Sequence, residues 1–312
     1  MKEKIGIVCV ATRRLSLMFT HAAQLAKCKY RDFHFYLLAD SIPQEILSWV
    51  TSQLPKNSTI VFGIFPNTDD NYMSKIRYGL SQGHEYCVKM DEDAILTADG
   101  WDKFFNLIES MGDDDLFCTG AISNGIPTCD LYINNYLLKY KPIIDNMFSL
   151  TRFGNPLYHQ LNSQNVEPWN TEEFYKKVWG LNTHFKGIHP VRVNFLANKF
   201  MNDKIMENFP STMKPIDSEV IRDNSKYPYF CNNIFGIRTK EWQDLLSRKD
   251  LFVDAFDEVV LSRYRNEKKK NMVIDTGIPI LHTMYNWAME WDYENKLIDQ
   301  INKTFNKEFA YA

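Results

Sequence analysis

A run of acidic residues directly follows a short apolar segment near residue 90. The segment Glu85 to Asp93 reads EYCVKMDED, a strand pattern that stops in Asp91, Glu92 and Asp93. Because successive side chains of an extended chain alternate, Asp91 and Asp93 are expected to point the same way. Two carboxylates on one side suit Mg²⁺ or Mn²⁺, with a diphosphate completing the coordination shell. Such an ion would neutralise the charge that builds up on a leaving diphosphate.

The structural alternative for these acids is a solvated turn that caps the next helix. Thr97 and Asp99 already suffice as caps, so Asp91 and Asp93 are not needed for that purpose. The strand followed by Asp-Glu-Asp-Ala-Ile-Leu resembles the Asp-X-Asp signature of nucleotide-sugar glycosyltransferases of the A-type, which have a single Rossmann-like domain. The resemblance implies metal dependence, with Asp93 at the ion, Asp91 at the ion or the ribose, and Glu92 beside the nucleotide.

The first strand ends in VATRR, at the edge where the A-type fold holds the base and ribose of its nucleotide. The resemblance therefore places Ala11 and Thr12 beside the nucleotide, with Thr12 able to hydrogen-bond the base. Arg13 or Arg14 could meet a phosphate. The alternative is an arginine pair on a solvated turn.

The second strand and the third helix supply further candidates. Asp40 follows the strand in LLAD, where an acid of this fold often contacts uracil or ribose; the alternative is a helix cap beside Ser41. Lys75 and Arg77 lie on the helix before the acidic strand, and the resemblance assigns a basic residue of this helix to the nucleotide. The two side chains point about 200° apart on a helix, so only one of them is expected to reach it.

Late positions complete the candidate site. His282 follows the last apolar strand, where many A-type transferases place a third protein ligand of the ion; the alternative is a structural histidine. Asp257 and Glu258 lie near the start of a predicted helix, which alone would explain two carboxylates through the helix dipole. Resemblance to inverting transferases makes Asp257, ahead of Glu258, the candidate catalytic base. Asn232 and Asn233 precede another strand, and we favour turn chemistry over sugar binding for them.

Strand and helix patterns alternate four times before the acids, which predicts a parallel, doubly wound α/β sheet. Ligands of such sheets bind outside the carboxyl ends of the strands, where residues 11–14, 40, 65–70 and 91–93 all fall. The expected fold is the A-type glycosyltransferase fold, with a largely helical insertion over the sheet edge. Strands are predicted at 5–10, 33–39, 59–64, 86–90, 115–119, 233–237 and 278–281, and helices at 15–30, 41–53, 72–82, 99–111, 130–150, 170–179, 191–208, 240–247, 255–264 and 285–309.

A single domain over residues 1–312 is expected, because the pattern between 151 and 229 is too scattered for a core of its own. A separate small domain in that region is the alternative. The expected parts are a nucleotide-sugar-binding half at 1–120, an acceptor-side insertion at 121–229, an acceptor and catalytic half at 230–285, and a C-terminal helix at 286–312.

Composition narrows the class of protein. The chain has 312 residues, 45% of them hydrophobic, and a net charge of −3, which does not indicate a strongly basic nucleic-acid binder. The six cysteines show no CxxC spacing, which disfavours a zinc site and indicates buried thiols in a reducing cytosol. No signal-peptide pattern and no run of about 20 apolar residues occurs, so a cytoplasmic protein without a transmembrane segment is expected.

The resulting hypothesis is a metal-dependent hexosyl- or pentosyltransferase that uses Mn²⁺ or Mg²⁺ and a nucleotide-sugar donor. UDP is the commonest nucleotide of the family, and transfer to a hydroxyl is expected to invert the anomeric carbon. A bacterial surface-glycan precursor is the expected acceptor. A modified base of phage DNA is the alternative, which would make nucleic acid a partner only as acceptor substrate.

Two functions outside glycosyl transfer compete with this hypothesis. One is that of a sugar-phosphate nucleotidyltransferase, which needs a Gly-rich loop after the first strand, whereas ATRR contains no glycine. The second is that of a non-catalytic carbohydrate-binding protein, which would not need metal-ligand acids at the end of a strand.

Overall fold

The computed structural model describes residues 2–11, 14–65, 71–125, 128–149, 195–223, 233–252, 257–282 and 291–305. Its strands are β1 Ile5–Ala11, β2 Phe33–Ala39, β3 Ser58–Phe62, β4 Tyr86–Asp91, β5 Ala94–Ile95, β6 Asp115–Ile122, β7 Val220–Asp223, β8 Ile234–Arg238 and β9 Asn271–His282. Its α-helices are α1 Met18–Lys27, α2 Gln44–Gln53, α3 Asn71–Ser81, α4 Ala98–Glu109, α5 Cys129–Tyr136, α6 Lys141–Ser149, α9 Phe195–Glu207, α10 Thr239–Ser247, α11 Asp257–Lys268 and α12 Trp291–Phe305.

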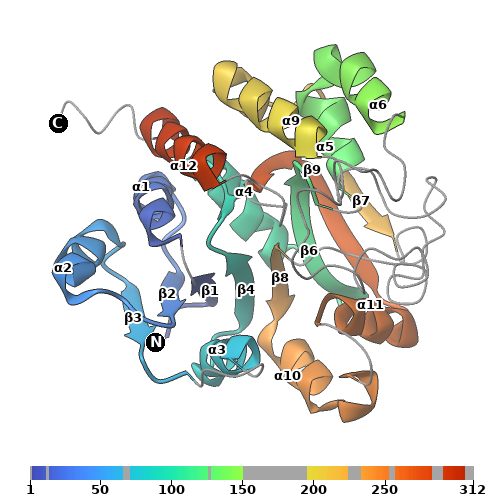
Figure 1. Cartoon of the computed structure of the whole chain (residues 1–312). Coiled ribbons are helices and arrows are strands. Elements are labelled where there is room, and N and C mark those ends of the chain that lie inside the picture. Colours follow the sequence, from blue (N-terminus) through green and yellow to red (C-terminus); the bar gives the residue numbers. More distant parts are fainter. Residues whose placement is uncertain are drawn as a thin grey trace.

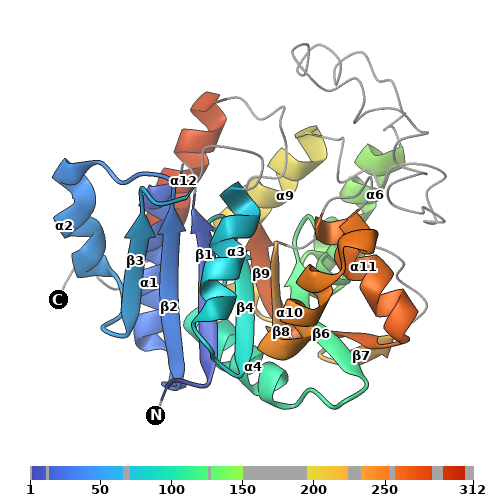
Figure 2. The same ribbon diagram turned by 90° about the horizontal axis from the view of Figure 1, so that it is seen from below.

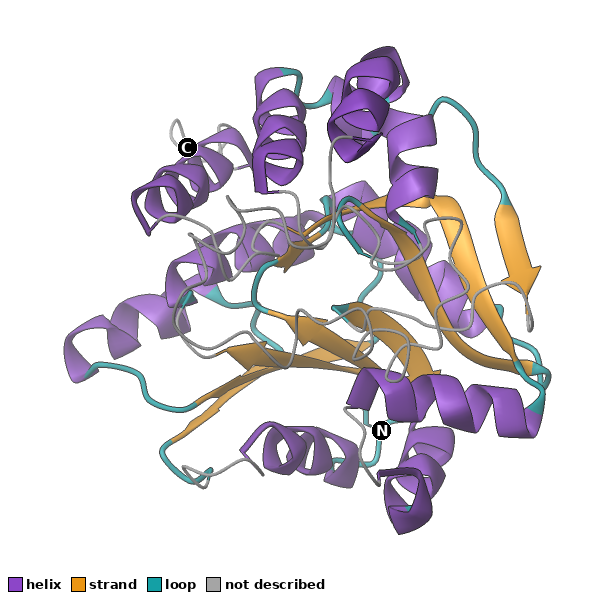
Figure 3. Ribbon diagram, turned by 45° about the vertical axis from the view of Figure 1, so that its right-hand side comes forward, coloured by secondary structure: helices purple, strands orange, loops and turns teal. Residues whose placement is uncertain are grey.

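The first four strands form the parallel half of the sheet, in the order β3-β2-β1-β4. β1 reads IGIVCVA and is buried at every position, as expected of a strand covered on both faces. Helices lie on both sides of the sheet, and the α/β class predicted from the alternating pattern is confirmed (Figure 1, Figure 3). Because these strands are parallel, Ala11, Asp40 and Asp91 come to one edge.

The second half of the sheet is mixed. β8 lies antiparallel between β4 and β6, and β6 in turn runs parallel to β9. The sheet thus continues in the order β4-β8-β6-β9, with β7 pairing antiparallel to β9. This arrangement brings the start of β8 and the ends of β4, β6 and β9 to the same edge, since an antiparallel strand begins where its neighbour ends.

A bulge near the end of β9 changes the direction of the strand and so sets the position of His282. Gly120 of β6 pairs with Asp275, whereas the next residue, Ala121, pairs with Pro279, so β9 carries extra residues at this step. A Cβ at Gly120 would lie 2.3 Å from the Ile278 carbonyl oxygen, so glycine allows this close approach. Beyond the bulge the end of β9 also pairs with the short strand β5. Bulges of this kind redirect a strand, often next to a functional site.

The helices form a layer on each face of the sheet (Figure 2). On one face α10 contacts both α3 and α11, and on the other face α1 contacts α2, α4 and α12. α3 sits close on β1, since a Cβ at Gly79 would lie 2.3 Å from Cγ2 of Val8. Close packing at this glycine, near the end of α3, holds the helix against β1, and Lys75 one turn earlier reaches the carbonyl oxygen of Ala11 at the end of that strand.

A second apolar cluster joins the chain's later helices to the sheet. Tyr132 and Ile133 of α5, Met201 of α9, and Leu297 and Ile301 of α12 belong to it. The helix expected at the C-terminal end is therefore present as α12, and it packs through buried side chains. Among the residues that the structure describes, none of the helices is both long and apolar enough to cross a bilayer.

Several expected elements differ from the observed ones. β5 and β7 were not predicted, and β9 has 12 residues where only its last few were expected. The polar run at Asp275 to Gly277, which forms the bulge, interrupts the apolar pattern of β9. The first half of this strand therefore could not be predicted from the sequence pattern. The helix expected at 191–208 is α9, whereas the one expected at 170–179 lies outside the described residues.

Candidate metal centre

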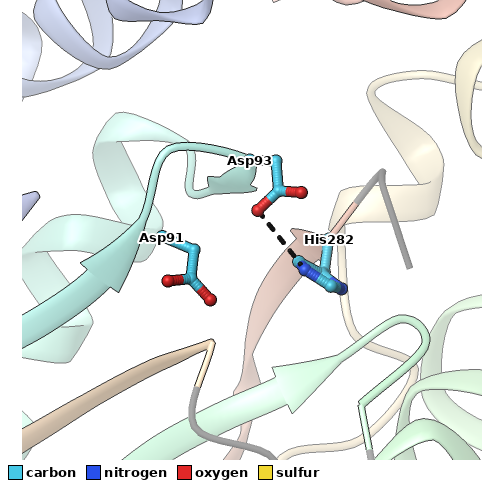
Figure 4. Close-up of side chains that lie close together, drawn as sticks. All are labelled: Asp91, Asp93 and His282. Atoms are coloured by element: carbon cyan, nitrogen blue, oxygen red, sulfur yellow. Dashed lines mark ion pairs between the residues drawn. The ribbon is translucent and has the colours of Figure 1, made fainter. Parts of the chain in front are cut away.

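Three side chains from two distant parts of the chain meet at the carboxyl edge of β4 and β9. Asp91 is the last residue of β4, Asp93 precedes β5, and His282 is the last residue of β9 (Figure 4). One ligand atom from each lies within 4.8 Å of the other two. In the part of the chain that the structure describes, no other group of three His, Cys, Asp or Glu side chains offers ligand atoms this close together.

Strand pairing explains this convergence. Ala94 of β5 pairs with His282 of β9, so the residue before β5 lies beside the histidine. His282 Nε2 lies 3.4 Å from Asp93 Oδ1. The expectation that the chain stays extended through Asp93 is wrong, because Glu92 and Asp93 form a turn between β4 and β5. The turn, and not strand alternation, brings the carboxylates of Asp91 and Asp93 together.

The cluster is open to solvent on one side. The side chain of Asp91 is 30% exposed, whereas those of Asp93 and His282 are 4% exposed. Burial raises the pKa of Asp91, and the charge of Asp93 adds to this effect while Lys89 opposes it. Burial would also raise the pKa of Asp93, but the imidazole of His282 and the guanidinium of Arg14 outweigh it and hold that pKa below its usual value. Any ligand of the centre would approach past Asp91.

The imidazole of His282 is held by three polar neighbours. Its Nδ1 lies 2.6 Å from Asn124 Oδ1, and since an amide oxygen only accepts, Nδ1 carries the proton. In the neutral imidazole Nε2 then keeps its lone pair and accepts a hydrogen bond from Asn233 Nδ2 at 3.0 Å, whereas in the protonated imidazole Nε2–H faces Asp93 Oδ1. The backbone N–H of His282 donates to the Ser123 hydroxyl at 3.1 Å. A tautomer fixed in this way leaves Nε2 as a metal ligand.

Two basic residues frame the acidic turn. Lys89 is buried beneath Asp91, with Nζ 2.7 Å from Oδ1. Arg14 Nη1 lies 3.3 Å from Asp93 Oδ2 and 3.5 Å from Glu92 Oε1. The Glu92 side chain is buried and faces this arginine, so its observed partner is a protein group. The Glu92 carbonyl oxygen accepts a hydrogen bond from His21 Nε2 at 2.7 Å, which anchors the turn to α1.

The predicted nucleotide residues form a second group, at the ends of β1 and β2. Asp40 Oδ1 accepts hydrogen bonds from Lys75 Nζ at 2.7 Å and from Asn71 Nδ2 at 2.8 Å. Lys75 is completely buried and also lies 3.4 Å from the Ala11 carbonyl oxygen, whereas Arg77 is exposed on the other side of α3. Lys75 and Arg77 thus differ as their spacing predicted. The helix-cap alternative for Asp40 is wrong, because the residue that caps α2 is Pro43.

The remaining candidates fall partly outside what the structure describes. Thr12 and Arg13 are not among the described residues. Asp257 and Glu258 open α11, but the description does not extend to their side chains. Their assignment as catalytic base therefore stays a prediction.

Sequence reasoning did not assign Ser123, Asn124, Asn233, Lys89 or His21 to the site. A signal existed for two of them. Asn124 follows a strand that runs parallel to β9, and Asn233 precedes a strand that pairs with β4. Both positions fall at the edge where the acids end, but this is evident only once the strand order is known.

The side chains present fit a divalent cation. Two carboxylate oxygens and one imidazole nitrogen are ligands that Mn²⁺ accepts, and carboxylates are those that Mg²⁺ prefers. The side chain of Asn124, which orients His282, also has a buried Nδ2 that finds no hydrogen-bond partner among the described residues. These contacts describe a centre in which the ligands are already positioned before an ion binds.

Comparison with known proteins gives distant structural similarity only. No protein-family model matches the chain, and no curated protein matches it. A mannosyltransferase from Pyrobaculum calidifontis, PcManGT, in complex with GDP-mannose and Mn²⁺, aligns over 100% of this chain and 65% of its own, with 7% identity and a TM-score of 0.46. The galactosyltransferase LgtC, in complex with donor and acceptor sugar analogues, aligns over 96% of each chain, with 11% identity and a TM-score of 0.41.

Both of these structures are glycosyltransferases. The chain spans 65% of the length of the mannosyltransferase. Since both similarities are distant, we base the function on the contacts of Asp91, Asp93 and His282.

Proposed function

We propose that the protein is a metal-dependent glycosyltransferase that moves a sugar from a nucleoside diphosphate sugar to a hydroxyl group. The observation that carries this proposal is the cluster of Asp91, Asp93 and His282 at the carboxyl edge of the sheet, with ligand atoms within 4.8 Å of one another. A divalent ion bound there would offset the negative charge that develops on a departing diphosphate.

The protein's own groups divide the remaining work. Arg14 lies against Asp93 and is placed to meet a phosphate oxygen beside the centre. Asp40 is 44% exposed, and among the described residues Lys75 and Asn71 both bind its Oδ1, so Oδ2 could accept a ribose or base hydrogen bond. These two positions extend the site along the edge from the centre toward β2, the direction in which a nucleotide would lie.

The catalytic base belongs to the proposal as well. Direct displacement at the anomeric carbon needs a carboxylate that takes the acceptor proton and is not itself a ligand of the ion. Asp257 at the start of α11 is our candidate, with Glu258 as its alternative. We propose inversion on this basis, with UDP as the nucleotide.

The acceptor and the compartment are proposed on weaker observations. A glycan-precursor hydroxyl is our first choice and a modified DNA base the second. We propose a cytoplasmic location because Cys9, Cys28, Cys87, Cys118 and Cys129 are buried free thiols, as in a reducing compartment.

A donor screen tests the proposal. Purified protein with Mn²⁺ is offered UDP-, GDP-, CDP- and TDP-sugars, and release of the nucleoside diphosphate is measured with glycan acceptors and with DNA that carries hydroxylated bases. One donor should be consumed, and excess EDTA should stop its consumption. Full activity in EDTA, or no turnover and no thermal stabilisation by any of the four diphosphates with Mn²⁺, would overturn the proposal. With DNA as the acceptor, affinity should fall steeply with salt.

A further inference from the structure

The carboxamide of Asn233 lies against two of the three ligand atoms of the candidate centre. Asn233 Nδ2 is 3.0 Å from His282 Nε2 and 3.4 Å from Asp91 Oδ2. Neighbouring ligands in an octahedral shell with bonds of 2.0–2.1 Å are separated by about 3 Å. The end of the Asn233 side chain therefore stands at the spacing of a further ligand in the same shell.

The backbone fixes Asn233 in this position. Its carbonyl oxygen accepts a hydrogen bond from the Asp91 N–H at 2.8 Å, and the next residue, Ile234, pairs with Met90 in the β4–β8 ladder. Asn233 is buried. The strand pairing that places Asp91 at the edge of the sheet thus also places Asn233 there, and the two cannot move apart without breaking the ladder.

The atom that faces the cluster is the wrong one for a metal. Nδ2 donates to the lone pair of His282 Nε2 and to the carboxylate of Asp91, so it occupies the lone pairs that an ion would use. When a cation binds, those lone pairs turn to it, and an N–H group aimed at the cation would be repelled. Rotation of the carboxamide by half a turn exchanges Nδ2 for Oδ1, an oxygen that Mn²⁺ and Mg²⁺ accept as a ligand.

We propose that Asn233 is a fourth protein ligand of the divalent ion. Without the ion, its Nδ2 holds the ligands His282 and Asp91 in place, and with the ion its side chain turns and coordinates through Oδ1. This inference rests on the metal dependence of the proposed function. It assigns to Asn233 a role that its position before β8 did not suggest from the sequence.

Binding of Mn²⁺ without nucleotide tests this directly, by titration of the free-ion signal in electron paramagnetic resonance. Asn233→Ala should lower the Mn²⁺ affinity by at least about 10-fold, the smallest loss expected even for a residue that only orients metal ligands. Asn233→Asp, which keeps an oxygen at the same place, should bind at least as tightly as the unmodified protein. Asn106 is exposed on α4, and Asn106→Ala and Asn106→Asp serve as matched controls that should leave the affinity unchanged.

The outcomes separate this inference from the proposed function. If the unmodified protein binds no Mn²⁺, the metal dependence of the proposed function fails. If it binds Mn²⁺ and Asn233→Ala binds as tightly, or Asn233→Asp binds more weakly, only the role of Asn233 is overturned. A crystal structure with Mn²⁺ gives a second measurement that does not depend on how well the variants fold. Oδ1 within coordination distance of the ion supports the inference, and Nδ2 still on Asp91 contradicts it.

Discussion

The two ends of the candidate site balance their charges differently. At the β2 end, Asp40 and Lys75 form a pair whose charges cancel, and Asn71 adds a hydrogen bond to the same carboxylate. At the β4 end, three carboxylates, those of Asp91 to Asp93, face two cations, Lys89 and Arg14. When His282 is neutral, these described side chains carry one negative charge in excess.

The network of Asp40, Lys75 and Asn71 is therefore charge-balanced without a ligand, whereas the cluster around Asp91 and Asp93 is not. The Asp40 network needs no ligand to satisfy its charges, so it can hold the start of α3 against β1 at all times. The β4 end gains from binding a cation, because buried like charges repel unless a counter-charge is present. We expect changes at the β4 end to remove activity, and changes at the β2 end to lower stability and the affinity for the nucleotide.

Asp93→Asn should give the largest effect. The substitution keeps the shape of the side chain but removes the negative charge that faces His282 and Arg14. Replacing a charged metal ligand by a neutral amide should lower the transfer rate by at least about 10³-fold, the size expected for several kcal/mol of charge stabilisation. Initial rates at saturating Mn²⁺ measure it, and the melting temperature confirms that the variant is folded.

The matched control for Asp93 is Asp113→Asn, since Asp113 is an exposed aspartate before β6. This variant should retain the full rate. If the rate of Asp93→Asn stays within tenfold of that of the unmodified protein, the β4 end of the site does not differ from the β2 end in its importance for activity.

Asp257→Asn should give the next largest effect, about 10²- to 10⁴-fold in rate, the range for a lost general base. Binding of the nucleotide sugar should be nearly unchanged, because the contacts proposed for the nucleotide involve Asp40, Arg14 and the centre. The anomeric configuration of the product, read from NMR coupling constants, decides the mechanism. Retention would remove the need for this base and leave Asp257 as an acid at a helix start.

The comparison also shows which parts of the site can be predicted from the sequence. The β2 end is built from consecutive strand–helix units, so the sequence pattern placed Asp40 after its strand and Lys75 and Arg77 on opposite sides of one helix. Their assignment to the nucleotide stays a prediction. The parallel order of β1 to β4 followed from the same pattern. Each of these elements is local, and a local pattern is sufficient to place them.

The β4 end depends on pairings between distant segments. His282 was predicted only by its position after a strand, whereas its partners Asn124 and Asn233 were not assigned to the site. They meet through an antiparallel strand, β8, and through the bulge in β9 opposite Gly120. Neither feature has a periodic signal in the sequence, because a bulge interrupts the pattern that reveals a strand.

The two partners of the charge-balanced pair, Asp40 and Lys75, should respond unequally to substitution. Asp40→Asn leaves the completely buried Lys75 without its carboxylate, and this should cost about 3 kcal/mol of unfolding free energy, the low end for a buried pair because Asp40 itself is 44% exposed. Lys75→Met removes the buried charge and leaves Asp40, 44% exposed, to be solvated, so its effect should stay within about 1 kcal/mol. Denaturant unfolding of both variants measures the difference. Equal losses of unfolding free energy in the two variants would contradict the view that only the charge of Lys75 is costly to leave unpaired.

The smallest effect concerns the titration of Asp40. Partial burial would raise the pKa of its carboxyl group, but hydrogen bonds from Lys75 and Asn71 outweigh burial and hold the pKa below the usual value. A depressed pKa contributes stability above the unfolded-state value of about 3.9, and this contribution is lost as the pH falls through the folded-state pKa. In Lys75→Met the opposing burial remains while the main cation is gone, so the pKa of Asp40 should rise. The chemical shift of the carboxyl carbon, followed by NMR below about pH 5, reports both values. An unchanged titration in Lys75→Met would show that Asn71 and solvent, and not the lysine, keep Asp40 ionised.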